Sequence, residues 1–216
     1  MKIALIGGRG RMGSAVAEVL REKGYDFFVI GREDDFSRYR EADLLIEFTT
    51  RDATVEHVKR VMEDPRPYII GTTGLTDEDI KLLKELSEKV PVLLSYNFSI
   101  GINVLLKLLG AIAGALEGYD VAIVEKHHRF KKDRPSGTAK LLESAIREGT
   151  DAPVDTHALR MGGIFGEHTV IFASQGEVIE ITHRALSRRV FAEGVIRAIE
   201  FIRSKDRGFY TMGDVI

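Results

Sequence analysis

The 216-residue sequence contains no cysteine. This absence excludes disulfide bonds, zinc–thiolate sites, iron–sulfur clusters and a thiol nucleophile, so the chemistry must come from other side chains. Long apolar runs are also absent. The longest candidate, residues 100–116, is interrupted by Lys107 and by several glycines, whereas a membrane span needs roughly 18 apolar residues.

The sequence has no large excess of charge of either sign, because 31 basic and 33 acidic residues give a formal net charge of −2. We therefore expect neither nucleic acid nor an anionic membrane as a partner. The first seven residues carry one basic side chain and a short apolar run, too little for a secretion signal, so a cytoplasmic protein is expected. A hydrophobic content of 44% and a charged content of 30% are typical of a folded globular chain.

Short apolar runs alternate with amphipathic stretches in residues 1–97, which is the pattern of βαβ units around a parallel sheet. We predict a doubly wound parallel sheet of the Rossmann type there, an α/β fold. The expected strands cover residues 2–6, 27–30, 44–48, 68–70 and 92–94, and the expected helices cover residues 11–23, 53–62 and 77–88.

The pattern changes after residue 97. An apolar helix is expected at 102–116, a strand at 121–124 and a helix starting near Ser136. Residues 156–161, 168–173 and 178–185 then alternate apolar and polar side chains, as half-exposed antiparallel strands do. We predict a second, smaller α+β domain over residues 98–186, and a helix within residues 187–216 that returns to the first domain.

A glycine-rich loop separates the first expected strand from the first expected helix. Its glycines stand at positions 7, 10 and 13, where a dinucleotide loop needs tight turning and close backbone approach. The helix N-terminus offers free N–H groups to a pyrophosphate, and Arg9 and Arg11 can add cationic contacts. The loop predicts a dinucleotide site, with an ordinary tight turn as the alternative. No P-loop Lys-Ser/Thr pair is present, which argues against a nucleoside triphosphatase.

The end of the second strand bears on the choice of cofactor. An acidic residue there favours NAD and a cation favours NADP. Arg32 stands nearest that position, followed by Glu33 and Asp34, so NADPH is favoured and NADH stays possible. A solvated turn residue is the alternative interpretation of Arg32. Residues 47–49 and 71–74 each end a strand, and their backbones should face the cofactor.

Residues 125–139 hold the densest group of chemically active side chains. Two imidazoles, His127 and His128, lie among several cations, and Ser136 is placed to cap a helix whose first N–H groups face an anion. Such a loop suits a small carboxylate substrate and supplies a proton donor, because histidine titrates near neutrality. The alternative is a solvated basic loop with incidental histidines.

The remaining histidines are weaker candidates for a functional site. His57, His157 and His168 are expected to be structural or at the surface, and His183 is undecided. We predict no metal site, because no second group of histidines and carboxylates has ligand spacing.

Taken together, these motifs resemble the 4-hydroxy-tetrahydrodipicolinate reductase family, long called dihydrodipicolinate reductase. The resemblance covers nearly the whole chain, and its most specific part runs from His127-His128 to Pro135-Ser136-Gly137-Thr138. The other matching motifs are the loop at 7–13, the turn at 71–74, residues 97–101, residues 166–169 and residues 182–184.

The resemblance implies NADPH- or NADH-dependent reduction of a cyclic dicarboxylate, with loss of water, to tetrahydrodipicolinate in lysine biosynthesis through diaminopimelate. It implies that His127 is a proton donor or acceptor and Lys131 a second proton donor, and the sequence leaves open which of them delivers the proton. His128 would contact the substrate, and Gly137 and Thr138 would hold a carboxylate.

The cofactor contacts implied by the resemblance lie in three loops, the last of them at the hinge between the domains; Arg32 comes from the strand-end argument. Relatives are commonly homotetramers assembled through the sheet of the second domain, so the resemblance implies a substrate-binding and oligomerisation domain at 98–186. The cofactor residues are Gly7, Gly8, Arg9, Gly10, Arg11, Met12, Arg32, Gly71, Thr72, Thr73, Ser95, Tyr96, Asn97 and Phe98.

The chain departs from the family pattern at two places. The segment from 30 to 44 is short, and Gly31 stands where family members often carry an acidic residue. The family pattern therefore does not specify the contacts to the adenosine end of the cofactor. A redox-sensing regulator that reads NADH and an amino-acid dehydrogenase that reduces an imine are the competing hypotheses.

Overall fold

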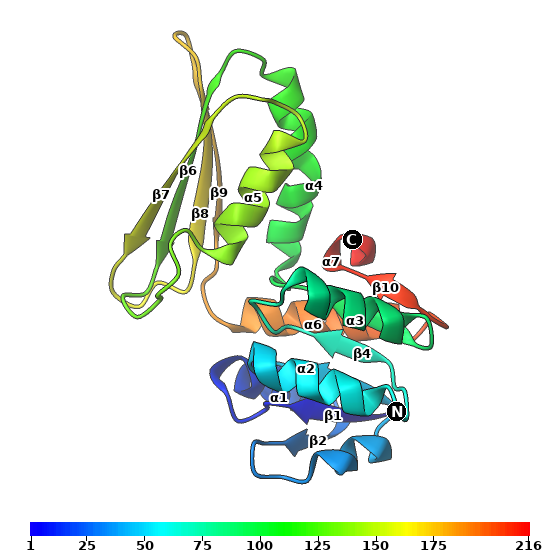
Figure 1. Cartoon of the computed structure of the whole chain (residues 1–216). Helices are drawn as coiled ribbons and strands as arrows, with labels where there is room; N and C mark the ends of the chain where they lie inside the picture. The colour runs from blue at the N-terminus through cyan, green and yellow to red at the C-terminus, as the bar shows by residue number, and fades with distance from the viewer. The chain divides into compact units, whose positions relative to one another are not determined.

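The computed structural model describes residues 1–216, and the chain divides into two units (Figure 1). Unit 1 consists of Met1–Ser99 and Arg189–Ile216, and unit 2 consists of Ile100–Arg188. None of the helices combines the length and apolarity that crossing a bilayer requires.

Unit 1 is built on a six-stranded sheet in which every pairing is parallel. Side chains on both faces of the central strands are buried, among them Ile3 and Leu5 on one face and Ala4 and Ile6 on the other. Strands covered on both faces read as continuous apolar runs, which is why the sequence predicted them. The Rossmann-type sheet is confirmed. Its order is β10 (Gly208–Tyr210), β5 (Pro91–Leu94), β4 (Tyr68–Ile70), β3 (Leu44–Glu47), β1 (Lys2–Ile6) and β2 (Asp26–Ile30).

Helices connect these strands. The apolar stripe of α1 buries Val16, Val19 and Leu20, and α1 packs against α6. A capping box, in which Thr76 and Asp79 satisfy each other's backbone N–H groups, begins α3. The helices of unit 1 are α1 (Arg11–Glu22), α2 (Arg51–Val61), α3 (Asp77–Ser87), α6 (Arg189–Ile202) and α7 (Met212–Val215).

Three short elements of unit 1 were not predicted. They are the three-residue strand β10, the four-residue helix α7 and a 3-10 helix, η1 (Phe36–Glu41). The helix η1 occupies the short segment after β2 and buries Phe36 and Tyr39. All three elements are too short to produce a recognisable hydrophobic period.

Unit 2 contains a four-stranded mixed sheet and two helices, α4 (Ile100–Ala115) and α5 (Gly137–Arg147). The strands lie in the order β7 (Val154–Arg160), β6 (Asp120–His127), β8 (Glu167–Ala173) and β9 (Val178–Arg184). Both helices share an apolar core with the sheet and lie on one side of it (Figure 1). The predicted α+β character is confirmed.

Two expectations for this sheet were wrong. The strand β7 pairs parallel, not antiparallel, with β6. The helix α5 lies between the two strands in the sequence and returns the chain to the end of the sheet at which β6 begins. The strand β6 also continues beyond Val124 to His127. Side chains alternate along a strand, so Glu125 and His127 lie on the buried face that also holds Val121 and Ile123.

Candidate functional site

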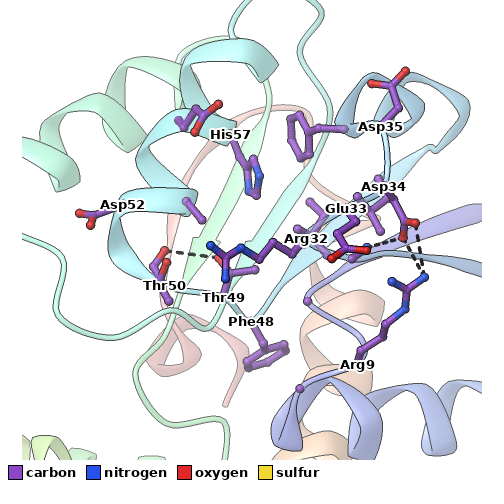
Figure 2. A pocket seen from close by; sticks show the side chains of 18 of the residues that line it. Arg9, Arg32, Glu33, Asp34, Asp35, Phe48, Thr49, Thr50, Asp52 and His57 are labelled. Atoms are coloured by element: carbon purple, nitrogen blue, oxygen red, sulfur yellow. Dashed lines mark hydrogen bonds and ion pairs between the residues drawn. The ribbon is translucent and has the colours of Figure 1, made fainter.

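A cavity of about 1050 Å³ lies in unit 1 at the carboxyl ends of β1, β2 and β3 (Figure 2). This is the edge of an open parallel sheet at which ligands bind. One wall comes from the loop after β1, a second from residues 30–36, and a third from residues 48–50 and the face of α2 that carries Asp52, Glu56, His57 and Arg60.

The glycine loop is shaped for a closely approaching ligand. Gly7 has a φ of +79°, and a Cβ at Gly13 would collide with the Gly7 carbonyl and the Gly8 backbone. Gly10 caps α1 without a side-chain hydrogen bond, and the first turn of the helix carries no acidic residue. The positive end of the helix is therefore uncompensated by the chain and fits the pyrophosphate of a dinucleotide.

The end of β2 combines a carboxylate with cations. Asp34 accepts a hydrogen bond from the Gly31 N–H at 2.7 Å, and the Arg9 guanidinium lies 3.1 Å from the same carboxylate (Figure 2). The Gly31 hydrogen bond and then Arg9 lower the pKa of Asp34, so it is ionised. Arg32 lines the same cavity. The loop after β1 and residues 30–36 thus offer one acceptor for a hydroxyl and two cations for a phosphate.

Beneath the cavity, Glu47 is fully buried at the end of β3. Its carboxylate accepts hydrogen bonds from the hydroxyls of Tyr68 and Thr49 and lies 3.1 Å from the Thr54 hydroxyl. His57 Nδ1 lies 2.8 Å from it. Burial and the adjacent carboxylate raise the pKa of Tyr68 well above its ordinary value. Two residues that line the cavity, Thr49 and His57, are thus held by a buried polar network.

His57 was expected to be structural or superficial, but it lines the cavity. Its ring stacks on Phe36 with centroids 3.9 Å apart and planes 10° apart, and the Arg60 guanidinium lies 5.0 Å from the Phe36 ring. These residues come from α2 and from the unpredicted η1. Because they are far apart in the sequence, spacing gave no signal for the stack.

Only part of the predicted cofactor set lines this cavity, namely Gly7, Arg9, Gly10 and Arg32. The loops after β4 and β5 meet the loop after β3 beside it, because the Phe48 ring lies against Gly71 and 5.6 Å from the Phe98 ring. Thr72 is buried, and its hydroxyl accepts a hydrogen bond from the Thr54 hydroxyl at 2.8 Å. The cavity lining does not include Gly8, Arg11, Met12, Gly71, Thr72, Thr73, Ser95, Tyr96, Asn97 or Phe98.

The predicted substrate residues all belong to unit 2. His127 is buried at the end of β6, where its Nδ1 is hydrogen-bonded to Glu125. The Lys131 ammonium lies 2.9 Å from Asp133, and the Lys131 N–H donates to the His128 carbonyl at 3.1 Å. These two contacts tie Lys131 to the loop, in which Arg129, Lys132 and Arg134 are exposed to solvent.

The helix α5 begins at Gly137, after the cap Ser136. The Ser136 hydroxyl accepts a hydrogen bond from the Ala139 N–H at 3.2 Å, and the first turn contains no acidic residue. A Cβ at Gly137 would meet nothing within 4 Å, so the backbone there is open to a ligand. The N–H groups of Gly137 and Thr138 can thus bind a carboxylate.

Burial influences the protonation of His127 and His168 in unit 2. Burial lowers the pKa of His127, while the Glu125 carboxylate opposes that shift. Burial, followed by repulsion from His127, lowers the pKa of His168 to about 3. The two rings lie 5.1 Å apart, and His168 Nε2 lies 3.3 Å from the Ser136 hydroxyl. His168, expected to be structural or superficial, is a buried neutral neighbour of His127.

Ligand atoms of Glu125, His127 and His168 lie within 4.8 Å of one another, a spacing that a metal ion can use. The Glu125 carboxylate, however, already has protein partners on both oxygens. One oxygen is hydrogen-bonded to His127, and the other lies 2.7 Å from Arg160 and 3.1 Å from the Ser136 N–H. The charge at this point is thus balanced by the chain's own Arg160.

Unit 1 has a parallel sheet with a glycine loop and a large cavity, and unit 2 carries an imidazole, an ammonium group and a helix without acidic residues in its first turn. Together these features define a nicotinamide nucleotide-dependent oxidoreductase. Residues 22–98 match the model of the dihydrodipicolinate reductase N-terminus, and residues 101–216 match that of the C-terminus. The chain belongs to the dihydrodipicolinate reductase family, which confirms the resemblance drawn from its motifs.

Similar proteins support this membership over the full length. The 4-hydroxy-tetrahydrodipicolinate reductase of Thermosipho africanus is 42% identical over 216 residues, with 100% of this chain and 98% of the relative covered. That of Archaeoglobus fulgidus is 40% identical over 257 residues, with both chains covered completely.

Solved structures show the same fold. A dipicolinate-bound dihydrodipicolinate reductase from Paenisporosarcina sp. TG-14 has a TM-score of 0.79 at 23% identity, covering 100% of this chain and 99% of the other. An amine dehydrogenase from Mycobacterium smegmatis has a TM-score of 0.65 at 11% identity, covering 98% and 95%. The amine dehydrogenase therefore shares the fold of this chain.

Proposed function

We propose that the chain reduces 4-hydroxy-tetrahydrodipicolinate to tetrahydrodipicolinate in lysine biosynthesis through diaminopimelate. The relatives above carry the name of this activity. The observation that carries the proposal is the arrangement in unit 2, where a buried imidazole, an ammonium group and an open helix N-terminus lie within residues 127–138. That combination suits a dicarboxylate that must receive a proton.

The proposed cofactor is NADPH, with NADH also accepted. When bound, the nicotinamide supplies the hydride. In this proposal the pyrophosphate lies on the glycine loop, and Arg32 and Arg9 receive a 2′-phosphate. Asp34 is placed to accept a hydrogen bond from a free 2′-hydroxyl, which supports use of NADH.

The chain itself must orient the substrate and move a proton. In the proposed complex the N–H groups of Gly137 and Thr138 hold one carboxylate, and His128 contacts the same ligand. His127 or Lys131 then delivers the proton that balances the added hydride, so that substrate, reduced nucleotide and one proton give product, oxidised nucleotide and water. General acid catalysis of this kind typically contributes 10²–10⁴ in rate.

We also propose a homotetramer assembled through the open face of the unit 2 sheet. The helices cover the other face, and the open one carries the half-buried side chains of Ala122, Val124 and Ile171. Exposed apolar residues Leu159 and Val178 extend it. A mass of four chains by light scattering would support this assembly, and a monomer at micromolar concentration would contradict it.

A coupled assay tests the proposed reaction. The oxidation of NADPH and of NADH is followed with freshly made product of dihydrodipicolinate synthase as substrate, and separately with oxaloacetate plus ammonia. Turnover with the first mixture alone is expected. Turnover with the second would indicate an amino-acid dehydrogenase. Nucleotide binding without turnover in either mixture would favour a redox-sensing regulator.

A further inference from the structure

Glu125 connects three parts of the substrate region although it does not reach solvent itself. One carboxylate oxygen is hydrogen-bonded to His127 Nδ1. The other accepts the Ser136 N–H at 3.1 Å and the Arg160 guanidinium at 2.7 Å. A single buried side chain therefore meets the imidazole, the start of α5 and the guanidinium.

The contact with His127 determines which ring nitrogen is available. A carboxylate on Nδ1 holds the proton there in the neutral ring, so Nε2 is the nitrogen that exchanges a proton with a ligand. A Cβ built at Gly166 would lie 3.2 Å from Nε2, so a side chain at that position would crowd this nitrogen. The ring is thus fixed in tautomer and orientation by its neighbour two residues earlier on β6.

Arg160 keeps Glu125 ionised. Its side chain is only 2% exposed, and its charge lies directly on Glu125. Burial opposes ionisation of Glu125, but Arg160, His127 and the Ser136 N–H together outweigh it and lower its pKa. A carboxylate stabilised in this way orients the imidazole without taking its proton.

The same pair anchors the basic loop. Arg160 also donates to the Asp133 carbonyl at 2.5 Å, and Asp133 lies beside the Lys131 ammonium. Through Ser136, Glu125 holds the beginning of α5, where the proposed carboxylate cradle lies. One buried carboxylate therefore contacts both the imidazole that donates the proton and the start of the helix that binds the anion.

We propose that Glu125 is a positioning residue for the reaction, which fixes His127 with Nε2 toward the substrate and holds the α5 N-terminus and the basic loop through Ser136 and Arg160. The inference rests on the proposed function for its catalytic meaning. Glu125 does not touch the substrate in this account, and its effect passes through His127.

The first test needs no variant. In the wild-type protein above the pKa of His127, long-range ¹H–¹⁵N correlation spectra are expected to show the Nδ1–H tautomer for this ring. An Nε2–H tautomer would overturn the proposal. Because this reading is independent of turnover, it also separates the inference from the proposed function.

The second test uses Glu125→Gln, which keeps size and hydrogen bonding but removes the charge. We expect kcat to fall about 100-fold or more with little change in the Kd of NADPH. The pH profile of kcat should lose its His127 limb or move it to lower pH, because the carboxylate favours the protonated ring. Glu125→Asp is expected to recover part of kcat and the wild-type tautomer.

Glu167→Gln is the matched control, because Glu167 is a buried carboxylate of the same sheet that pairs with Lys126 and Arg184 instead. It should leave the His127 tautomer and the pH profile unchanged. A folded Glu125→Gln protein with a wild-type tautomer and pH profile would overturn the proposal. If the wild-type tautomer is Nδ1–H but the synthase product is not reduced, only the proposed function fails.

Discussion

The Arg160 guanidinium and the Glu125 carboxylate form an ion pair 2.7 Å apart in which neither side chain reaches solvent, with exposures of 2% and 0%. Removing Arg160 leaves the buried Glu125 charge without its guanidinium partner. Arg160→Met should therefore lower the free energy of unfolding by about 3–5 kcal/mol, and the double change with Glu125→Gln should cost clearly less. Denaturant titration measures both.

The exposed pair Arg147–Glu143, at 3.0 Å on α5, is the control for that comparison. Arg147→Ala should cost no more than about 0.5 kcal/mol. Equal losses for the buried and the exposed arginine would mean that Arg160 is not electrostatically coupled to Glu125.

Lys131→Ala should reduce kcat by about 10²–10⁴-fold and leave the Kd of NADPH nearly unchanged, because the proposed role of Lys131 is at the substrate. Lys132→Ala is a matched control, since Lys132 is the exposed next residue of the same loop. Stopped-flow single turnovers and nucleotide fluorescence titration separate the two quantities. Near-normal turnover of Lys131→Ala would remove the basic loop from the mechanism.

Arg32→Ala should weaken NADPH about tenfold or more and NADH much less, because a charge-assisted hydrogen bond to a phosphate is worth about 1.5–3 kcal/mol. Asp34→Asn should weaken NADH more than NADPH. Arg38→Ala, which removes an arginine paired with Glu41 outside the cavity, is the control. Equal effects of Arg32→Ala on both nucleotides would show that Arg32 does not contact the 2′-phosphate.

His168 should make the fold sensitive to acid. Its pKa is about 3 in the folded chain, against an ordinary value of 6.5. Between these values the unfolded state binds more protons, so stability should fall as the pH drops from about 6.5, by up to about 1.4 kcal/mol per pH unit. Burial also lowers the pKa of His127, which acts in the same direction.

His168→Gln removes one of these titrating groups. Its free energy of unfolding should differ from that of the wild type by a constant above pH 7 and show a shallower decline between pH 6.5 and pH 4.5. Denaturation curves at matched ionic strength give both slopes. Parallel curves over the whole range would contradict the buried neutral state of His168.

The sequence predicted features that depend on local chemistry. The glycines at 7 and 13 are required where a positive φ or close backbone contact excludes a Cβ, so the loop was recognisable without a structure. Ser136 was likewise recognisable as a helix cap. The central strands of unit 1 followed from apolar runs that are buried on both faces.

Features that depend on distant partners were missed. Nothing near position 160 indicates that its arginine is buried on Glu125, because the parallel pairing of β7 with β6 brings them together. The stack of His57 on Phe36 likewise requires η1, which has no hydrophobic period. The one available signal was the spacing of Glu125 and His127, which places them on one face of a strand if β6 extends that far.

A crystal structure with NADPH and pyridine-2,6-dicarboxylate would show where the protein binds a dicarboxylate. We expect the dicarboxylate on the N–H groups of Gly137 and Thr138 beside His127, with its ring about 3.5 Å from the nicotinamide. A dicarboxylate bound away from residues 127–138, or far from the nicotinamide ring, would contradict the account.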